Sequence, residues 1–207
     1  MIDQIGRHRV KCGDVMNGID DLMQGEKADF IYSDPPWGQG NLRYWQTINK
    51  RHTGKGPSEI SYIEFLPHFF NTVGKFCKDV CCIEYGQRWR EDLIVESSKV
   101  GFKSHGVFAS LYQASKLLPL DIHVFSKSGS VHIPDNFADK LLECRGQQVV
   151  KYVFETLLPD GAKVVLDPMC GMGYTAQAAC DNGLIFYGNE LNEKRLEKTK
   201  ARLRKDL

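Results

Sequence analysis

The sequence predicts an α/β protein in which strands and helices alternate along one chain. Short apolar runs of the kind that form buried strands alternate with longer amphipathic runs of helical period. Two of the short runs end in turns rich in Pro or Gly, and open α/β sheets bind ligands at the carboxyl ends of their strands. The 207 residues, 42% of them hydrophobic, suffice for one compact domain with its own core.

The elements follow from apolar runs and from the residues that bound them. Runs bounded by Gly, Asp or Pro predict strands over 9–12, 28–33, 80–85, 122–126, 163–167 and 184–189. Amphipathic runs predict helices over 61–77, 87–100, 147–158, 175–182 and 192–204, the last with Asn192 as its N-cap. The polar, Gly-containing segments 40–57 and 127–136 are expected to be long surface loops.

Composition narrows the class of protein only slightly. The chain has 27 basic and 26 acidic residues, a formal net charge of +1, so a nucleic-acid surface requires local clustering of cations. Seven cysteines form no paired CxxC sets, so we expect reduced thiols and no metal site. No apolar run approaches the roughly 20 residues of a membrane span, and no secretory signal is present, so we expect a soluble, intracellular protein.

The first informative motif is ADFIYSDPPWGQG, which places an acid, two prolines and a tryptophan directly after an expected strand. An exocyclic amine of a nucleobase is a poor nucleophile because its lone pair is delocalised into the ring, so its methylation needs acceptors for both N–H groups. The Asp34 carboxylate and the Pro35 carbonyl are two such acceptors, and Pro36 adds no backbone donor. Trp37 offers a flat face on which a flipped base can stack.

An isolated Asp-Pro-Pro is more often only a turn. Here it ends a strand within an α/β pattern that also carries a second, glycine-rich strand end, and this context favours a catalytic role. An aspartate with a reference pKa of about 3.9 is too weak a base to deprotonate the neutral amine beforehand. Proton loss is therefore expected to follow or accompany methyl transfer.

The second motif, KVVLDPMCGMGYTAQAAC followed by LIFYGNELN, is typical of a strand, glycine-rich turn, helix, strand and acid. Gly171 and Gly173 fit a nucleotide-binding turn, and Glu190 follows at about the 20-residue spacing of an acid that binds ribose. This pattern suits any adenosine-containing cofactor. A nicotinamide or flavin dinucleotide is the alternative, but Asp167 and Pro168 stand where a pyrophosphate prefers N–H groups without a nearby anion. Asp167 would suit the cationic amino-acid end of S-adenosylmethionine.

Together the motifs resemble those of the amino-methyltransferases of DNA, in the group whose catalytic tetrad precedes the cofactor turn. KCGDVMNGIDDLMQGEKADFIYSDPPW and GQQVVKYVFETLLPDGAKVVLDPMCGMGYTAQAACDNGLIFYGNELN carry the resemblance, which spans most of the chain. It implies a Rossmann-like, class I S-adenosylmethionine-dependent methyltransferase fold, a seven-stranded mixed sheet with helices on both faces and an antiparallel last hairpin. It also implies a single domain over 1–207, with a catalytic half over about 1–145 and a cofactor half over about 146–207.

The resemblance assigns roles to particular residues. The implied catalytic residues are Asp34, Pro35, Pro36 and Trp37, and the implied cofactor-binding residues are Asp14, Asp34, Gln147, Asp167, Pro168, Met169, Cys170, Gly171, Gly173, Glu190, Leu191 and Asn192. Asp14 would contact the adenine of the cofactor and Glu190 its ribose. The chain departs from the family at Met169, where an aromatic is usual, and after Gln147, where Lys-Pro is common. Trp37 replaces the commoner Tyr and keeps the stacking face.

A basic and aromatic cluster, LRYWQTINKRHTGK, follows the first motif. Its expected nucleic-acid contacts are Arg43, Tyr44, Trp45, Lys50, Arg51 and Lys55, with cations on phosphates and aromatics stacked on the strand. A solvated loop of mixed charge is the alternative. Few residues between Tyr85 and Gly146 remain for a recognition domain, so we expect short or relaxed sequence specificity, or dependence on a partner.

These observations predict an S-adenosylmethionine-dependent DNA methyltransferase that modifies the exocyclic N6 amine of a flipped-out adenine. Its expected partner is DNA, with RNA an open alternative, and its expected location is the cytoplasm of a bacterial or phage-infected cell. An aspartate at the head of the tetrad, Asp34, where a serine is the alternative, favours adenine over cytosine as the base that is methylated. Three alternative functions remain: an RNA adenine methyltransferase, a DNA cytosine N4-methyltransferase and an inactive nucleic-acid-binding partner subunit. A homodimer is an alternative for the assembly.

Overall fold

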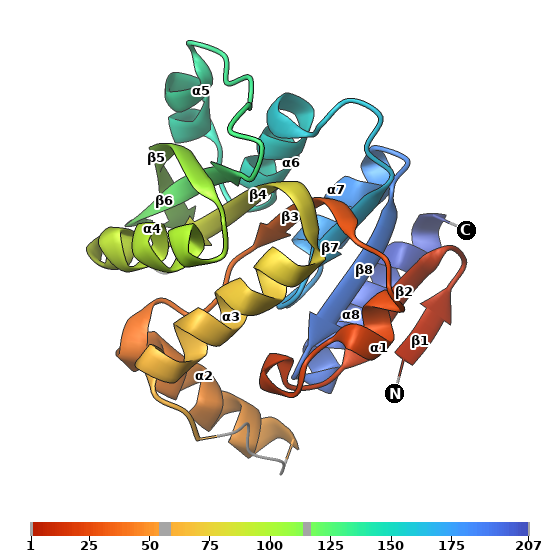
Figure 1. Cartoon of the computed structure of the whole chain (residues 1–207). Helices are drawn as coiled ribbons and strands as arrows, with labels where there is room; N and C mark the ends of the chain where they lie inside the picture. The colour runs from red at the N-terminus through yellow and green to blue at the C-terminus, as the bar shows by residue number, and fades with distance from the viewer. Residues whose placement is uncertain (1, 54–58, 114–116, 207) are drawn as a thin grey trace.

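The computed structural model describes residues 2–53, 59–113 and 117–206. Its centre is one eight-stranded sheet in the order β1-β2-β8-β7-β3-β4-β6-β5 (Figure 1). The strands are β1 (Ile2–Ile5), β2 (His8–Cys12), β3 (Ala28–Ser33), β4 (Cys77–Tyr85), β5 (Lys103–Gln113), β6 (Leu117–Ser126), β7 (Val164–Asp167) and β8 (Ile185–Glu190). All six strands that the sequence predicts are present, most of them extended or shifted by a few residues.

The helices alternate with the strands as the sequence predicts. They are α1 (Asp20–Met23), α2 (Gly38–Thr53), α3 (Tyr62–Phe76), α4 (Arg90–Lys99), α5 (Phe137–Glu143), α6 (Gln147–Leu157), α7 (Tyr174–Asp181) and α8 (Glu193–Leu203), with short 3₁₀ turns at η1 (Val15–Asn17), η2 (Gln87–Trp89) and η3 (Arg204–Asp206). The five predicted helices correspond to α3, α4, α6, α7 and α8. Asn192 caps α8 as expected, because its side chain accepts from the backbone N–H of Arg195.

The sheet is mixed. Strands β2, β8, β7, β3 and β4 run parallel, whereas β6 runs antiparallel to β4 and forms an antiparallel hairpin with β5, as the resemblance implies. The expected number of seven strands is wrong by one. The additional strand is β1, which pairs antiparallel with β2 at the edge of the sheet. Its four residues, IDQI, are too short and too polar to indicate a strand by themselves.

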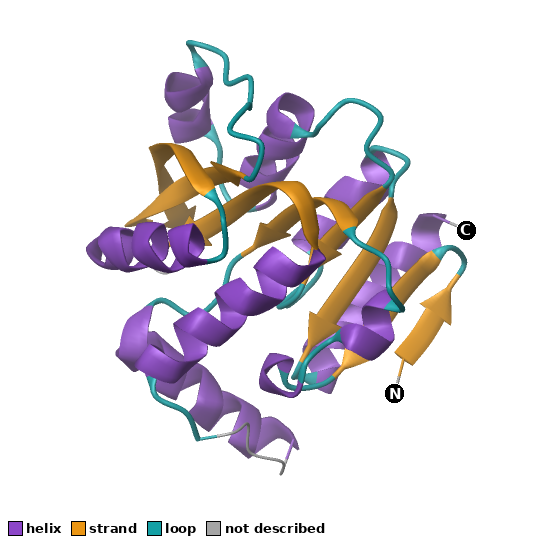
Figure 2. Ribbon diagram, in the orientation of Figure 1, coloured by secondary structure: helices purple, strands orange, loops and turns teal. Residues whose placement is uncertain are grey.

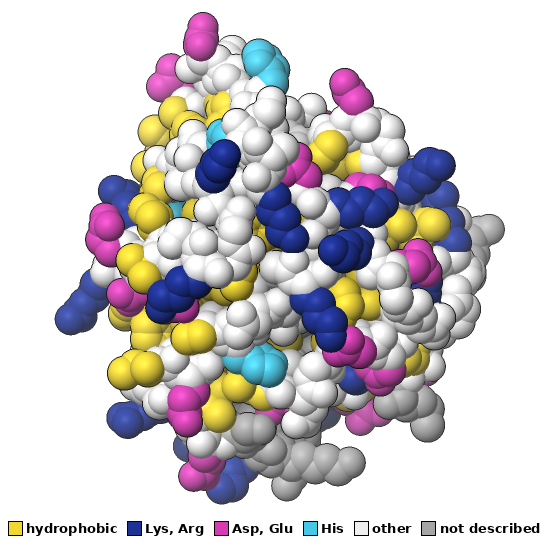
Figure 3. All heavy atoms as spheres, in the orientation of Figure 1, with side chains coloured by type: hydrophobic (Ala, Val, Ile, Leu, Met, Phe, Trp, Pro, Cys, Tyr) yellow, Lys and Arg dark blue, Asp and Glu magenta, His cyan; other side chains and the backbone are white. Residues whose placement is uncertain are grey.

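Helices cover both faces of the sheet (Figure 2). Successive residues of a strand point to opposite faces, so Phe30 and Tyr32 pack with α6, α7 and α8, whereas Ile31 packs with α1, α3 and α4. Ala28 packs on the same face as Ile31, because the register of β3 shifts between Ala28 and Phe30. On the latter face, Lys and Arg side chains gather near the centre with acidic side chains beside them (Figure 3). Lys75 pairs there with Asp20.

The segment 40–57, expected to be a loop, is helical over its described part, and that expectation is wrong. Helix α2 begins at Gly38 and ends at Thr53, and residues 54–57 lie outside the described residues. Its apolar stripe is weak, because Leu42, Trp45 and Ile48 are separated by polar residues, so the helix depends on contacts with the rest of the fold. The other expected loop, 127–136, is irregular as predicted.

In the part of the chain that the structure describes, no helix combines the length and the apolar character that crossing a bilayer requires.

Candidate active site at the carboxyl ends of the parallel strands

One cleft of about 700 Å³, partly open to solvent, lies at the carboxyl ends of the parallel strands. It is lined by Gly13, Asp14, Val15, Met16, Asp34, Pro36, Leu42, Trp45, Gln46, Asn49, Ile60, Phe65, Pro168, Met169, Asn189, Glu190, Leu191 and Arg195. The two sequence motifs, more than a hundred residues apart in the chain, therefore border the same space. Its mainly apolar walls, with a few acidic and amide side chains among them, are typical of a small-molecule site.

The glycine-rich turn after β7 is held from beneath by Asp167. Its carboxylate accepts hydrogen bonds from the Met169 backbone N–H (3.1 Å), the Thr175 hydroxyl (2.7 Å) and the Ser33 hydroxyl (2.8 Å). Burial raises the pKa of Asp167 to about 6 despite these three donors. Asp167 thus ties the turn to β3 and to the start of α7, and its side chain is buried behind the cleft.

The turn has its shape because two positions require glycine. Gly171 and Gly173 have φ of +52° and +83°, in the left-handed region that other residues avoid. A Cβ on Gly173 would lie 2.9 Å from the Cα of Thr199, so the missing side chain also allows the turn to approach α8. The thiol of neighbouring Cys170 is buried, and its pKa is raised, first by burial.

Glu190 closes the turn from the end of β8. One carboxyl oxygen accepts from the Gly171 backbone N–H (2.9 Å) and the other from the Asn192 backbone N–H (2.7 Å). The side chain nevertheless lines the cleft, and each carboxylate oxygen has a second lone pair with which to accept a ligand hydroxyl. Burial raises the pKa of Glu190.

Asn189 contributes a feature that the sequence does not indicate. Its amide nitrogen donates to the carbonyls of Gly13 and Pro168 (both 3.1 Å), which joins the ends of β2 and β7. Its amide oxygen has no hydrogen-bond partner among the described residues, although the residue is only 1% exposed and lines the cleft. A buried acceptor without a partner is costly unless a ligand donor satisfies it, so Asn189 supports a donor-bearing ligand in this cleft.

The Asp-Pro-Pro-Trp segment folds back on itself after β3. The indole N–H of Trp37 donates to Asp34 (2.9 Å), and the Tyr85 hydroxyl donates to the Pro36 carbonyl (2.8 Å). The ring of Trp37 meets the edge of Tyr112, with centroids 5.9 Å apart. The catalytic residues implied by the resemblance therefore lie on one rigid turn, with Tyr112 from β5 as an aromatic neighbour that sequence reasoning missed.

A second acid lies beside Asp34. Ser33 of β3 pairs with Ile83 of β4, so the next residues of the two parallel strands, Asp34 and Glu84, are neighbours. The Tyr32 hydroxyl donates to Glu84 (2.7 Å). Desolvation by the neighbouring side chains, followed by the charge of Glu84, raises the pKa of Asp34 well above its ordinary value, although Asp34 is exposed to solvent. The sequence signal for Glu84 is weak: a single acid near the end of the apolar run VCCIEY.

Helix α2 divides the residues expected to bind nucleic acid into two groups. Trp45 faces the cleft, and α2 is fastened beside it by a hydrogen bond from Asn192 to Asn49 (3.1 Å). The exposed side of α2 carries the other described members of the group, Arg43, Tyr44, Lys50 and Arg51. Three of these, all basic, border a shallow groove of about 1,190 Å³ that is largely open to solvent. Lys55 lies outside the described residues.

Several residues that the resemblance assigns to the cofactor do not line the cleft. Gln147 begins α6 and does not line the cleft. The residues of the glycine-rich turn that lie behind the wall of the cleft are Asp167, Cys170, Gly171 and Gly173. The assigned residues that do line the cleft are Asp14, Asp34, Pro168, Met169, Glu190 and Leu191. The side chain of Asn192 is occupied by capping α8 and by its bond to Asn49. Arg195, which no sequence motif indicated, is part of the lining.

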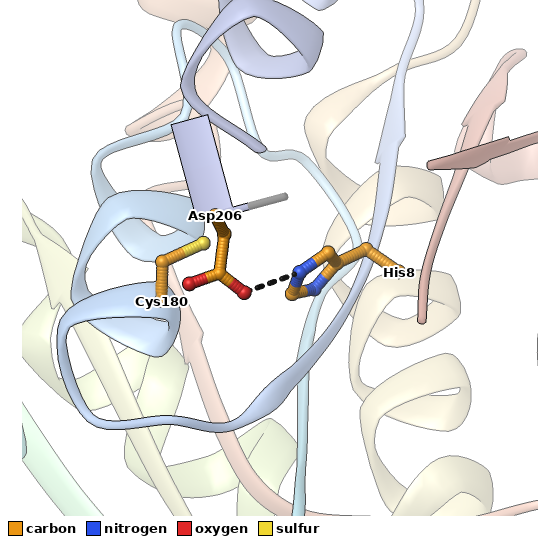
Figure 4. Close-up of side chains that lie close together, drawn as sticks. All are labelled: His8, Cys180 and Asp206. Atoms are coloured by element: carbon orange, nitrogen blue, oxygen red, sulfur yellow. Dashed lines mark hydrogen bonds and ion pairs between the residues drawn. The ribbon is translucent and has the colours of Figure 1, made fainter. Parts of the chain in front are cut away.

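Among the described residues, one group has the spacing of metal ligands: His8, Cys180 and Asp206 (Figure 4), none of which lines the cleft. The backbone N–H of Phe186 donates to Nδ1 of His8 (3.1 Å), which assigns the proton of the neutral ring to Nε2. Nε2 lies 3.1 Å from Asp206, which also accepts from Arg7. The neutral imidazole has no free lone pair, so this group is a clamp between the carboxyl-terminal turn and β2.

No protein-family model matches the chain, and no curated protein matches its sequence. Solved structures match its fold. M1.HpyAVI in complex with SAM has a TM-score of 0.68 at 15% identity over 94% of this chain and 98% of that chain. TTHA0409 from Thermus thermophilus, named as a proposed DNA modification methylase, has a TM-score of 0.66 at 18% identity. The match covers 96% of this chain and 95% of that chain.

The cytosine-N4-specific PvuII DNA methyltransferase is also similar, with a TM-score of 0.64 at 12% identity over 93% of this chain and 85% of that chain. At these identities the comparison establishes that the chain has a Rossmann-like fold of the kind these proteins share. The residues of the cleft carry the argument for function.

Proposed function

We propose that this protein is an S-adenosylmethionine-dependent DNA methyltransferase that modifies the N6 amine of adenine. The observation that carries the proposal is the convergence of Asp34 and Glu190 on one cleft, each at the carboxyl end of a parallel strand. One acid belongs to a segment suited to hold an amine and the other to a segment suited to hold a ribose. The folds of M1.HpyAVI bound to SAM and of PvuII DNA methyltransferase support the same class of reaction.

The cleft fits the proposed cofactor in its chemistry. Its apolar lining, which includes Val15, Met16, Leu42, Phe65 and Met169, suits the flat faces of an adenine. Glu190 offers carboxylate lone pairs to ribose hydroxyls, and Asn189 offers its unpartnered amide oxygen to a ligand donor. When bound, S-adenosylmethionine supplies an electrophilic methyl group.

The residues around Asp34 would hold the target amine. The Asp34 carboxylate and the Pro35 carbonyl accept its N–H groups, while Trp37 supports the flipped base by stacking. Because desolvation and Glu84 raise the pKa of Asp34, its carboxylate accepts a proton more readily at neutral pH than a solvated aspartate does. Asp34 is therefore suited to take the proton that the amine releases as it is methylated.

The outer side of α2 would hold the nucleic acid. Arg43, Lys50 and Arg51 are exposed on this helix, directly after the Asp-Pro-Pro-Trp turn, and border one groove. Cations in this position can bind the phosphates that flank a flipped-out base. The modest net charge of +1 is consistent with a local contact surface of this kind.

The test is to incubate the protein with S-adenosylmethionine and unmethylated DNA or RNA, digest the product to nucleosides and identify the methylated nucleoside by mass spectrometry. We expect N6-methyldeoxyadenosine, and no product from Asp34→Ala, although this variant should still bind the cofactor. N4-methyldeoxycytidine, or methylation of RNA alone, would correct the substrate. Cofactor binding without any product would indicate a partner subunit, and full activity of Asp34→Ala would overturn the role of Asp34.

A further inference from the structure

Helix α8 presents one cation to a cleft that is otherwise bordered by acids. Among the described residues that line the cleft, Arg195 is the single Lys or Arg, whereas Asp14, Asp34 and Glu190 are acidic. Arg195 lies one turn into α8, five residues after Glu190. Its half-buried side chain thus belongs to the cleft and not to the solvated face of the helix.

The position of the guanidinium group is defined by two contacts. Its Cζ lies 4.5 Å from the centroid of the Trp45 ring, a cation–π arrangement. On the other side, a Cβ added to Gly171 would come within 2.9 Å of an Arg195 terminal nitrogen. The group is therefore held between α2 and the glycine-rich turn. Desolvation raises the pKa of Asp34 and of Glu190, and the charge of Arg195 opposes this rise at both acids.

No described residue forms a hydrogen bond or ion pair with this guanidinium group. The contrast with the other partly buried arginines is clear: Arg9 donates to the Leu22 carbonyl and pairs with Glu26, and Arg90 pairs with Asp121. Arg195 keeps five N–H donors available at a defined place in the cleft wall. A planar guanidinium in this state is suited to bind a carboxylate through two parallel hydrogen bonds.

We propose that Arg195 binds the carboxylate at the amino-acid end of S-adenosylmethionine. This inference rests on the proposed function, which places the ribose at Glu190 and the methyl group opposite the amine held by Asp34. The amino-acid end would then lie in the part of the cleft that Arg195 lines. The surrounding acids attract the cofactor's ammonium and sulfonium charges but repel its carboxylate, so the carboxylate needs this cation.

The experiment compares two ligands that differ only in the carboxylate: S-adenosylmethionine and its decarboxylated analogue. Their affinities for the full chain are measured by calorimetry, without nucleic acid, for the wild type, Arg195→Gln, Arg195→Lys and Lys194→Gln. Lys194→Gln is the matched control because it removes an exposed cation from the same helix outside the cleft. Circular dichroism and thermal unfolding confirm that each variant is folded.

We expect the wild type to bind S-adenosylmethionine about 10- to 100-fold more tightly than the analogue, the range of one charge-assisted contact. Arg195→Gln should lose this preference, because it weakens the binding of S-adenosylmethionine and leaves that of the analogue unchanged. Arg195→Lys should keep part of the preference, and Lys194→Gln should keep all of it.

Equal weakening of both ligands by Arg195→Gln would overturn the inference and assign Arg195 to packing against Trp45. The binding of duplex DNA by the same variants is measured separately at several salt concentrations. If Arg195→Gln leaves the affinity for the cofactor unchanged but binds DNA more weakly and with less salt dependence, the inference is also overturned, because the anion bound by Arg195 is then a phosphate. In both of these results the cofactor still binds, so the proposed function survives. If the wild type binds neither ligand, the proposed function fails and this inference with it.

Discussion

Two acids that border the same cleft, each at the carboxyl end of a parallel strand, have different surroundings. Both carboxyl oxygens of Glu190 accept backbone N–H groups, from Gly171 and Asn192, so this side chain is a structural clamp as well as the proposed acceptor for the ribose. Asp34 accepts only from the Trp37 indole among described residues and lies beside a second acid, Glu84. These surroundings fit the two proposed roles, in which Glu190 holds the ribose and Asp34 takes a proton.

The largest expected effect is that of Asp34→Asn on catalysis. The amide still offers one oxygen to the target amine, but it cannot accept the released proton, so we expect kcat to fall by about a hundredfold or more. Cofactor binding should persist, because Glu190 and the apolar walls are intact. Radiolabel transfer and calorimetry measure the two quantities. A variant with normal kcat would show that Asp34 does not take the proton.

Glu190→Gln tests the clamp. A glutamine oxygen can accept only one of the two backbone N–H groups, and its own amide would then face the other, so we expect stability to fall by about 1–3 kcal/mol. We also expect the affinity for S-adenosylmethionine to fall about tenfold or more, because a bond to the ribose is lost. Denaturant unfolding and calorimetry measure both. Loss of kcat without loss of affinity would reverse the roles of the two acids.

Glu84→Gln should move the pH profile while changing the maximal rate less than Asp34→Asn does. Activity requires ionised Asp34, so protonation of Asp34 sets the acidic limb. The charge of Glu84 raises the pKa of Asp34; removing it lowers that pKa, and the acidic limb should move to lower pH. The measurement is kcat/KM against pH. An unmoved limb would mean that Glu84 has only a packing role.

The smallest expected effect is that of Tyr32→Phe. The Tyr32 hydroxyl donates to Glu84 and so favours its ionised form. Without this donor, Glu84 is protonated more readily and opposes the ionisation of Asp34 less, so the acidic limb of kcat/KM against pH should move in the same direction as for Glu84→Gln, by less. A shift toward higher pH would contradict this chain of interactions.

Much of the site was predictable because its signals are local. The Asp-Pro-Pro-Trp turn and the glycine-rich turn depend on backbone restrictions that act between neighbouring residues, and both lie where the sequence predicts, after β3 and β7. The buried parallel strands were predictable for the same reason, since each is a short apolar run. Helix α2 was not predictable, because its apolar stripe is weak and its contacts, such as the hydrogen bond from Asn192 to Asn49, join residues distant in the chain.

Glu84, Arg195 and Asn189 mark the limit of the sequence. Each is an ordinary residue near a strand end or a helix start, and even Asn189, which precedes Glu190 in the second motif, carries no signal of its own. Their significance comes from strand register and helix packing, which bring Glu84 beside Asp34 and lay Arg195 between Trp45 and the glycine-rich turn. Pairings of this kind join residues that are distant in the chain.

The α/β class, the main strands and the two turns can be predicted from the sequence alone, because strand burial and turn geometry are short-range properties of the chain. The packing of the folded chain sets how those turns share one cleft, which acid is clamped and which lies beside another acid, and which cation faces them. Burial, charge proximity and hydrogen-bond satisfaction depend on neighbours in space, and these exist only once the sheet has formed.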